Sequence, residues 1–146
     1  MKTVFIGSVK LSAVALETLF DLNIKIDLVC SLDETAAAPV CDYSPLHQIA
    51  QKHGTDFITF TKISEITQKV IEIAPDYLFC IGLSQIISQQ LIESAGCAIG
   101  FHPTPLPKYR GRAPIPWMIL LEEKNPKISL FKIDGGTDSG DILHQE

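Results

Sequence analysis

Hydrophobic residues are arranged along this chain in two alternating patterns. Short, nearly continuous runs, typical of buried strands, are separated by segments in which hydrophobic residues recur every three or four positions, as on one face of a helix. The runs predict strands at 2–6, 24–30, 57–60, 76–81, 97–101 and 128–133. The helical spacing predicts helices at 11–22, 45–54, 63–73, 84–93 and 113–121.

Alternating strands and helices predict an α/β fold. We expect a Rossmann-like, mostly parallel sheet with helices on both faces, joined by right-handed crossovers. Such sheets bind ligands at the carboxyl ends of their strands. Asp42 or Ser44 is expected to cap the second helix, with Pro45 at its first position, and the small-residue loop 33–41 is a candidate pocket wall.

Length and composition indicate one domain. A chain of 146 residues with 46% hydrophobic and 20% charged residues is expected to bury about 70% of its unfolded surface in one core. No apolar run reaches membrane-spanning length and residues 1–20 lack a secretory pattern, so we expect a cytoplasmic protein without membrane association. The four cysteines form no C-x-x-C pair, and neither disulfides nor a metal site is expected.

Charge and missing motifs exclude several functions. A formal net charge of −5 makes a nucleic-acid partner unexpected. In the first turn Gly7 is followed by the residues Ser-Val-Lys-Leu, without the glycines that a dinucleotide pyrophosphate requires. The chain contains no G-x-x-x-x-G-K, G-x-S-x-G or H-E-x-x-H motif, so the usual signals of phosphoryl transfer, serine hydrolysis and zinc hydrolysis are missing.

Two segments carry candidate chemistry. Residues 99–117 place five prolines and three cations around a histidine that follows a predicted strand. Fixed proline dihedral angles lower the entropy cost of presenting polar side chains to a phosphate or carboxylate; the alternative is a rigid solvated loop. Residues 133–143 form a glycine-rich acidic turn after another predicted strand. The polar side chains that the proline-rich segment 99–117 would present to such a ligand are those of Thr104, Lys108, Arg110 and Arg112.

Together these segments resemble the folate-dependent formyltransferase family, whose pattern is H-P-S/T-x-L-P, R-G, a tryptophan and later D-x-G. The matching residues are His102-Pro103-Thr104, Leu106-Pro107, Arg110-Gly111, Trp117 and Asp138-Ser139-Gly140. The resemblance implies that His102 and Asp138 are catalytic. His102 would stabilise the negative oxygen or move a proton, and Asp138 would orient or charge the imidazole, without a metal. Singly, each has an ordinary structural alternative: a hydrogen-bonded histidine at a strand end and a turn carboxylate.

The resemblance also implies two binding regions. Leu83, Ser84, Gln85, Ile86 and Ile87 would border the folate, although Ser84 could instead cap a helix. Gly7, Ser8, Val9 and Arg112 would lie near the second substrate, with Arg112 gripping a phosphate, although a surface cation is the alternative. The implied co-substrate is 10-formyltetrahydrofolate.

The chain departs from the family pattern in two places. Family members usually carry asparagine two residues before the histidine, where its amide donates to the developing oxyanion, whereas this chain has Gly100. The chain also ends at Glu146, so we expect residues 1–146 to form a single N-terminal catalytic domain that is incomplete at its C-terminus.

The resemblance leaves three functional hypotheses. The first is formyl transfer to a primary amine on a nucleotide-linked amino sugar, which the run Arg110-Gly-Arg-Ala-Pro favours. The second is formylation of methionyl-tRNA, which should need a basic surface or an added RNA-binding domain. The third is a relative that binds folate or a nucleotide without turnover, which Gly100 and the early end of the chain suggest. Oligomeric state is not indicated.

Overall fold

A computed structural model describes all residues, 1–146, and contains one sheet of seven strands. The strand order is β3-β2-β1-β4-β5-β6-β7, with β1 to β5 parallel and β6 and β7 antiparallel to their neighbours. The mostly parallel sheet is therefore as predicted. The elements are β1 (Thr3–Gly7), α1 (Lys10–Asp21), β2 (Leu28–Leu32), the 3-10 helix η1 (Glu34–Ala36), α2 (Leu46–Lys52), β3 (Phe57–Phe60), α3 (Ser64–Ile73), β4 (Tyr77–Ile81), α4 (Gln89–Glu93), β5 (Cys97–His102), α5 (Pro114–Leu120), β6 (Ser129–Lys132) and β7 (Ile142–Gln145).

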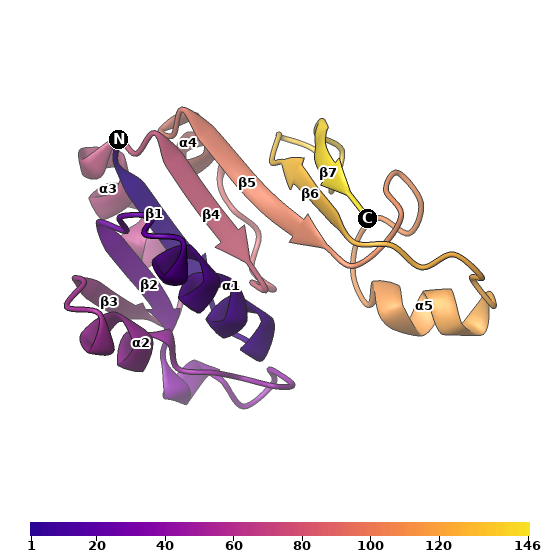
Figure 1. Cartoon of the computed structure of the whole chain (residues 1–146), viewed down its shortest axis with the longest axis horizontal. Coiled ribbons are helices and arrows are strands. Elements are labelled where there is room, and N and C mark those ends of the chain that lie inside the picture. The colour runs from indigo at the N-terminus through magenta and orange to yellow at the C-terminus, as the bar shows by residue number, and fades with distance from the viewer.

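Helices cover both faces of the parallel strands, as the alternation predicts (Figure 1). Side chains of successive strand residues point to opposite faces, and β1 divides its residues between two buried clusters. Val4 and Ile6 pack with α3 and α4, whereas Phe5 packs with α1 and α2. A ligand is expected beyond these clusters, among the loops that follow the carboxyl ends of the strands.

Two predicted boundaries were wrong. The second strand begins at Leu28, not at Ile24, because parallel pairing with β1 begins at the Val4–Leu28 pair. The second helix begins at Leu46 and is not capped by Asp42 or Ser44. Its first amide instead donates to the Ser31 hydroxyl on β2, at 2.9 Å. A cap supplied from another element leaves no signal next to the helix in the sequence.

The helix predicted at 84–93 is reduced to α4. Ser88 is the N-cap and its hydroxyl accepts from the Leu91 amide, so a capping role for Ser84 was the wrong alternative. Residues before Ser88 are kept out of the helix by Gln85, whose side-chain oxygen accepts from the Ile63 amide at 2.7 Å. Its side-chain nitrogen donates to the Thr61 carbonyl at 2.9 Å.

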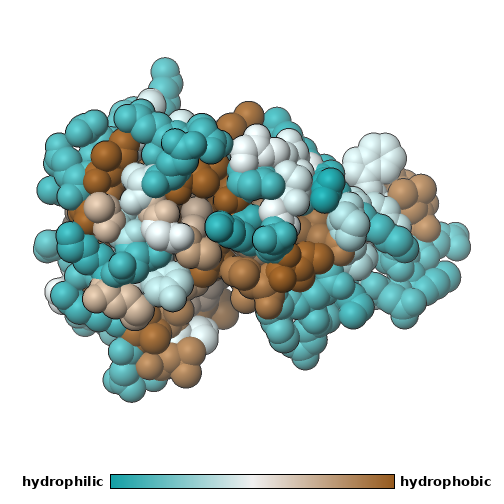
Figure 2. Space-filling model, turned by 90° about the horizontal axis from the view of Figure 1, so that it is seen from above, coloured by the Kyte–Doolittle hydropathy of each residue, from teal (hydrophilic) through white to brown (hydrophobic).

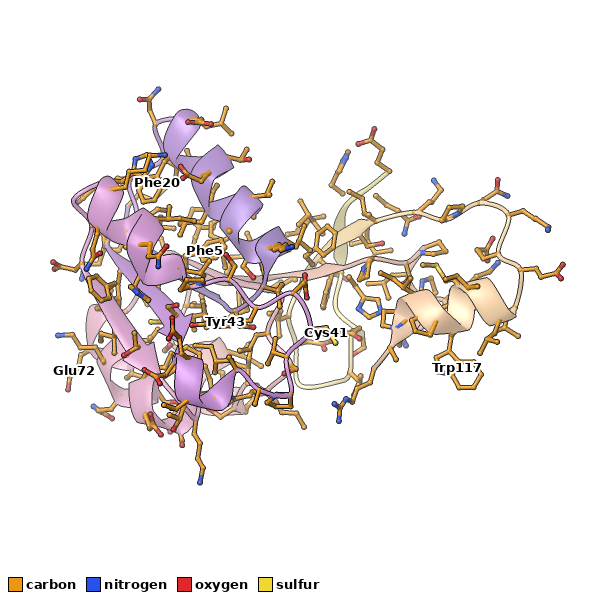
Figure 3. The ribbon with its side chains drawn as sticks, turned by 90° about the horizontal axis from the view of Figure 1, so that it is seen from below. Phe5, Phe20, Cys41, Tyr43, Glu72 and Trp117 are labelled. Carbon is orange, nitrogen blue, oxygen red and sulfur yellow. The ribbon has the colours of Figure 1, made fainter.

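The C-terminal part of the chain extends to one side of the parallel strands (Figure 1). It contains β7, which was not predicted, and α5, which begins with Pro114 in its first turn. Several large hydrophobic side chains are exposed here, and Trp117, 54% exposed, points away from the sheet (Figure 3). In the space-filling view hydrophobic residues reach the surface near the middle of the molecule and toward one end (Figure 2). No helix combines the length and hydrophobicity that crossing a membrane requires.

The turn after β1 is packed so closely that it admits only glycine at position 7. A Cβ there would lie 2.5 Å from the Ser12 Cβ and 2.8 Å from the Ile81 carbonyl oxygen. We therefore expect Gly7→Ala to lower the free energy of unfolding by about 1–3 kcal/mol through overpacking. Urea unfolding of this variant checks the expectation. Gly54→Ala measures backbone strain without overpacking, since a Cβ there meets no atom within 4 Å and only the positive φ is unfavourable. Wild-type stability of the Gly7→Ala variant would contradict the packing argument.

Candidate active site

A cavity of about 780 Å³ opens at the carboxyl edge of the sheet. Its size lies within the range of about 300–1,000 Å³ that is usual for small-molecule sites. Parts of the chain far apart in sequence line it: the turn after β1, the segment after β4, the end of β5, and the loops after β5 and β6. The location agrees with the rule for open α/β sheets.

His102 is the last residue of β5 and is buried at the wall of this cavity. Its Nε2 lies 2.8 Å from the Tyr109 carbonyl oxygen. Because a carbonyl can only accept, Nε2 carries a proton and donates it to Tyr109. The ring nitrogen left for a substrate is therefore Nδ1.

Asp138 lies against this free nitrogen. Its Oδ2 is 3.5 Å from His102 Nδ1 and also accepts a hydrogen bond from the Gly111 amide, at 2.8 Å. A carboxylate oxygen therefore lies beside the ring nitrogen that Tyr109 does not occupy. The structure thus brings together the two residues singled out as catalytic, which are 36 positions apart in the sequence.

The loops that carry this pair have an unusual backbone. Tyr109, Ala113 and Asp138 are non-glycine residues with φ of 58°, 53° and 46°, and Gly111 has φ of 90°. A left-handed conformation costs a residue with a side chain about 1–2 kcal/mol. Such positions cluster at functional sites when the surrounding structure holds them. Here the Gly111 amide donates to Asp138 and His102 donates to the Tyr109 carbonyl, which hold three of these four residues.

The segment after β4 forms a mainly hydrophobic wall of the cavity. All five residues singled out at 83–87 line it, and Ile92 of α4 adds to the same wall. Cys80 of β4 also reaches the cavity. Burial raises the pKa of its thiol, with a smaller contribution from Cys30, so that the thiol stays neutral and is a poor nucleophile.

The turn after β1 contributes one residue to the cavity, Val9. Gly7 and Ser8 do not line it. Ser8 is buried and its hydroxyl donates to the Gly82 carbonyl at 2.6 Å, which ties this turn to the end of β4. Ser12 accepts from the Ser8 and Val9 amides, each at 3.2 Å.

The loop after β2 reaches the cavity through Pro39, Val40 and Cys41, as its small-residue composition indicated. Its position is fixed by an isolated bridge between Val9 and Tyr43. Figure 3 shows Cys41 on the side of the loop that faces the C-terminal part of the chain. No individual residue of this loop was singled out from the sequence, because none has a motif.

The four polar side chains of the proline-rich segment are not brought to one place. Thr104 is fully buried, and its hydroxyl donates to the Lys108 carbonyl at 2.9 Å. The Lys108 ammonium lies 3.8 Å from Glu123. Neither these two residues nor Arg110 lines the cavity. Arg112 does, and it has no ion pair or side-chain hydrogen bond in the structure.

Comparison with known proteins agrees with this geometry. The sequence profile of the family described as formyl transferase matches residues 27–146. The chain belongs to the formyl transferase family. The prediction from the His102 and Asp138 segments is thereby confirmed at the level of the family.

Two similar curated proteins are both named methionyl-tRNA formyltransferase. The methionyl-tRNA formyltransferase of Ehrlichia ruminantium (strain Gardel) is 30% identical over 155 residues, covering 100% of this chain and 50% of the relative. That of Clostridium botulinum (strain Alaska E43 / Type E3) is 35% identical over 109 residues, covering 71% and 35%. The chain spans about half the length, or less, of the curated relatives that it matches.

Solved structures of formyltransferases share the fold. Phosphoribosylglycinamide formyltransferase from Bacillus halodurans superposes with a TM-score of 0.80 at 17% identity, covering 100% of this chain and 78% of the other. A sugar 3N-formyl transferase, solved in the presence of dTDP and 5-N-formyl-THF, gives 0.72 at 21% identity, covering 100% and 51%. At these identities the likeness concerns the fold alone.

Proposed function

We propose that this chain carries the reacting centre of an enzyme that transfers a formyl group from 10-formyltetrahydrofolate to a primary amine. The observation that carries the proposal is the contact of His102 Nδ1 with Asp138 at the wall of a cavity at the carboxyl edge of the sheet. The family match supports the same chemistry.

The arrangement suits the charges of this reaction. An amine that attacks the formyl carbon forms a C–N bond and leaves negative charge on the formyl oxygen and positive charge on its own nitrogen. His102 can donate from Nδ1 to that oxygen when protonated, and Asp138 stabilises the charged ring. The amine proton passes to Asp138 or to water, and the folate nitrogen takes a proton as its bond to the formyl carbon breaks.

The cavity fits a folate as co-substrate. The hydrophobic wall 83–87 can cover one face of a flat ring, and its backbone groups can pair with the ring edge. The neutral thiol of Cys80 offers no competing nucleophile. None of these steps needs a metal ion.

For the acceptor, we place methionyl-tRNA first. Relatives up to 35% identical are named methionyl-tRNA formyltransferases. Although the chain is acidic overall, residues 103–132 hold six of its 12 basic residues and only Glu122 and Glu123 as acids. This local excess of basic residues along the chain suits a nucleic-acid backbone, and the exposed Trp117 is available to stack on a base. The nucleotide-linked amino sugar predicted from the sequence is the second candidate, supported by the run Arg110-Gly-Arg-Ala-Pro.

A panel of acceptors tests the proposal. The purified chain is incubated with 10-formyltetrahydrofolate and either methionyl-tRNA or nucleotide-linked amino sugars, and tetrahydrofolate release is followed by absorbance. Release that requires one acceptor class supports the proposal and selects the acceptor. Measurable folate binding without release in any mixture would contradict it and favour a binding protein.

Arg112 provides a further prediction. Because it lines the cavity without an acidic partner, it is available to hold a phosphate of either acceptor. We expect Arg112→Ala to raise KM for the acceptor about tenfold with little change in kcat, since a phosphate contact contributes to binding in the ground and transition states alike. Lys62→Ala is the control on the surface beside α3. Equal KM values in the Arg112 variant and the wild type would show that Arg112 is only a surface cation.

A further inference from the structure

Gly100 on β5 has an aromatic ring where a side chain would project. A Cβ built at this residue would lie 2.8 Å from both Cε1 and Cζ of Phe131, and 3.0 Å from Cγ1 of Ile133. Phe131 is the cross-strand neighbour of Gly100 in the antiparallel β5–β6 pair. Folding of an aromatic ring over a cross-strand glycine is a known way of stabilising a sheet.

This glycine lies beside the reacting centre. Gly100 and His102 are two residues apart on β5, so their side-chain directions share one face of the sheet. Gly100, Phe131 and His102 all line the cavity. The ring of Phe131 therefore occupies the space next to the His102 imidazole that a residue-100 side chain would otherwise fill.

The residues paired with Gly100 and His102 on the adjacent strands present no amide or free hydroxyl to the cavity. On β4, the residue paired with Gly100 is Cys80. Ile133 comes two residues after Phe131, directly after β6, and also lines the cavity. Opposite His102 on β6 is Ser129, whose buried hydroxyl donates to the Thr104 carbonyl at 2.7 Å. The Ser129 hydroxyl is thus already committed and does not serve the cavity.

We infer that Gly100 and Phe131 act as one unit that keeps a hydrogen-bond donor away from the formyl oxygen, leaving His102 as the side-chain donor from the sheet. The inference rests on the proposed formyl transfer and deepens it. It gives Phe131 a role beside the reacting centre and accounts for glycine at a position where the family resemblance leads one to expect asparagine. It also implies that oxyanion stabilisation limits the rate of this chain.

Paired substitutions test the inference. Phe131→Val removes the ring, and Gly100→Asn then places an amide in the vacated space. The matched control is Gly100→Leu with Phe131→Val, because leucine has nearly the shape of asparagine but no donor. One oxyanion donor contributes about 10²–10³ in rate, so the Asn/Val double variant should have a kcat larger than the Leu/Val variant by that factor. Gly100→Asn alone should lose folate affinity. The new side chain and the Phe131 ring cannot occupy the same space, so one of them would be displaced into the cavity.

The outcomes separate the inference from the proposed function. Circular dichroism and thermal unfolding establish that each double variant is folded, and Gly100→Ser with Phe131→Leu is a milder pair if the first does not fold. Equal kcat in the Asn and Leu pairs, with turnover that still requires His102, would overturn the inference and leave formyl transfer standing. No turnover in the wild type or in the Asn pair, despite folate binding, would overturn both.

Discussion

Replacing His102 with alanine is expected to lower kcat for formyl transfer by about 10²–10⁴ while leaving folate affinity nearly unchanged. The imidazole is the side chain that can donate from Nδ1 to the formyl oxygen, and it lies beside Asp138. Alanine supplies neither, and the hydrophobic wall 83–87 that we assign to the folate remains. Tetrahydrofolate release measures kcat, and fluorescence quenching measures folate affinity.

The matched control for this substitution is His144→Ala. His144 lies on β7, its side chain is 64% exposed, and it does not line the cavity. We expect wild-type kinetics from it. If the His102 variant kept wild-type kcat, His102 would be only a hydrogen-bonded residue at a strand end, and the catalytic assignment would be lost.

Replacing Asp138 with asparagine is expected to lower kcat by about 10²–10⁴, because the amide cannot stabilise a charged imidazole or accept the amine proton. Its oxygen can still accept from the Gly111 amide, so the turn should keep its structure. We therefore expect an unfolding midpoint close to that of the wild type. Steady-state kinetics and thermal unfolding of the same sample measure both effects.

Asp141→Asn controls for the loss of one negative charge in the same acidic segment. Asp141 is exposed, and its side chain makes no hydrogen bond or ion pair in the structure. Its kinetics should match the wild type. A parallel loss of kcat and of stability in the Asp138 variant would mean that the carboxylate acts through loop structure and not on the imidazole.

Much of the fold was predictable because hydrophobic periodicity reports burial directly. β1, β4 and β5 lie where continuous hydrophobic runs predicted buried strands, and their neighbours confirm the parallel sheet. The errors occur where partners distant in sequence decide the structure. Ser31 caps α2 from a strand, and Gln85 holds its segment out of a helix by bonds to Thr61 and Ile63. Neither contact has a local pattern.

The candidate site was predictable where a residue follows directly from a strand end. His102 continues β5, so its place at the carboxyl edge followed from the strand itself. The polar residues of the proline-rich loop were less predictable, because proline fixes a backbone without fixing the direction of its neighbours. Thr104 turns inward to the Lys108 carbonyl, while Arg112 reaches the cavity. Phe131 has no motif, and only its contact with Gly100 reveals it.

Single-turnover transfer of an isotopically labelled formyl group shows directly whether this chain moves the group to an amine through His102. The chain, in excess, is mixed with labelled 10-formyltetrahydrofolate and with methionyl-tRNA or a nucleotide-linked amino sugar, and the label is located by mass spectrometry. We expect label on the amine of one acceptor, at a rate that His102→Ala lowers by about 10²–10⁴. Label recovered as formate with or without acceptor, or transfer at the wild-type rate in the His102 variant, would contradict the proposed function.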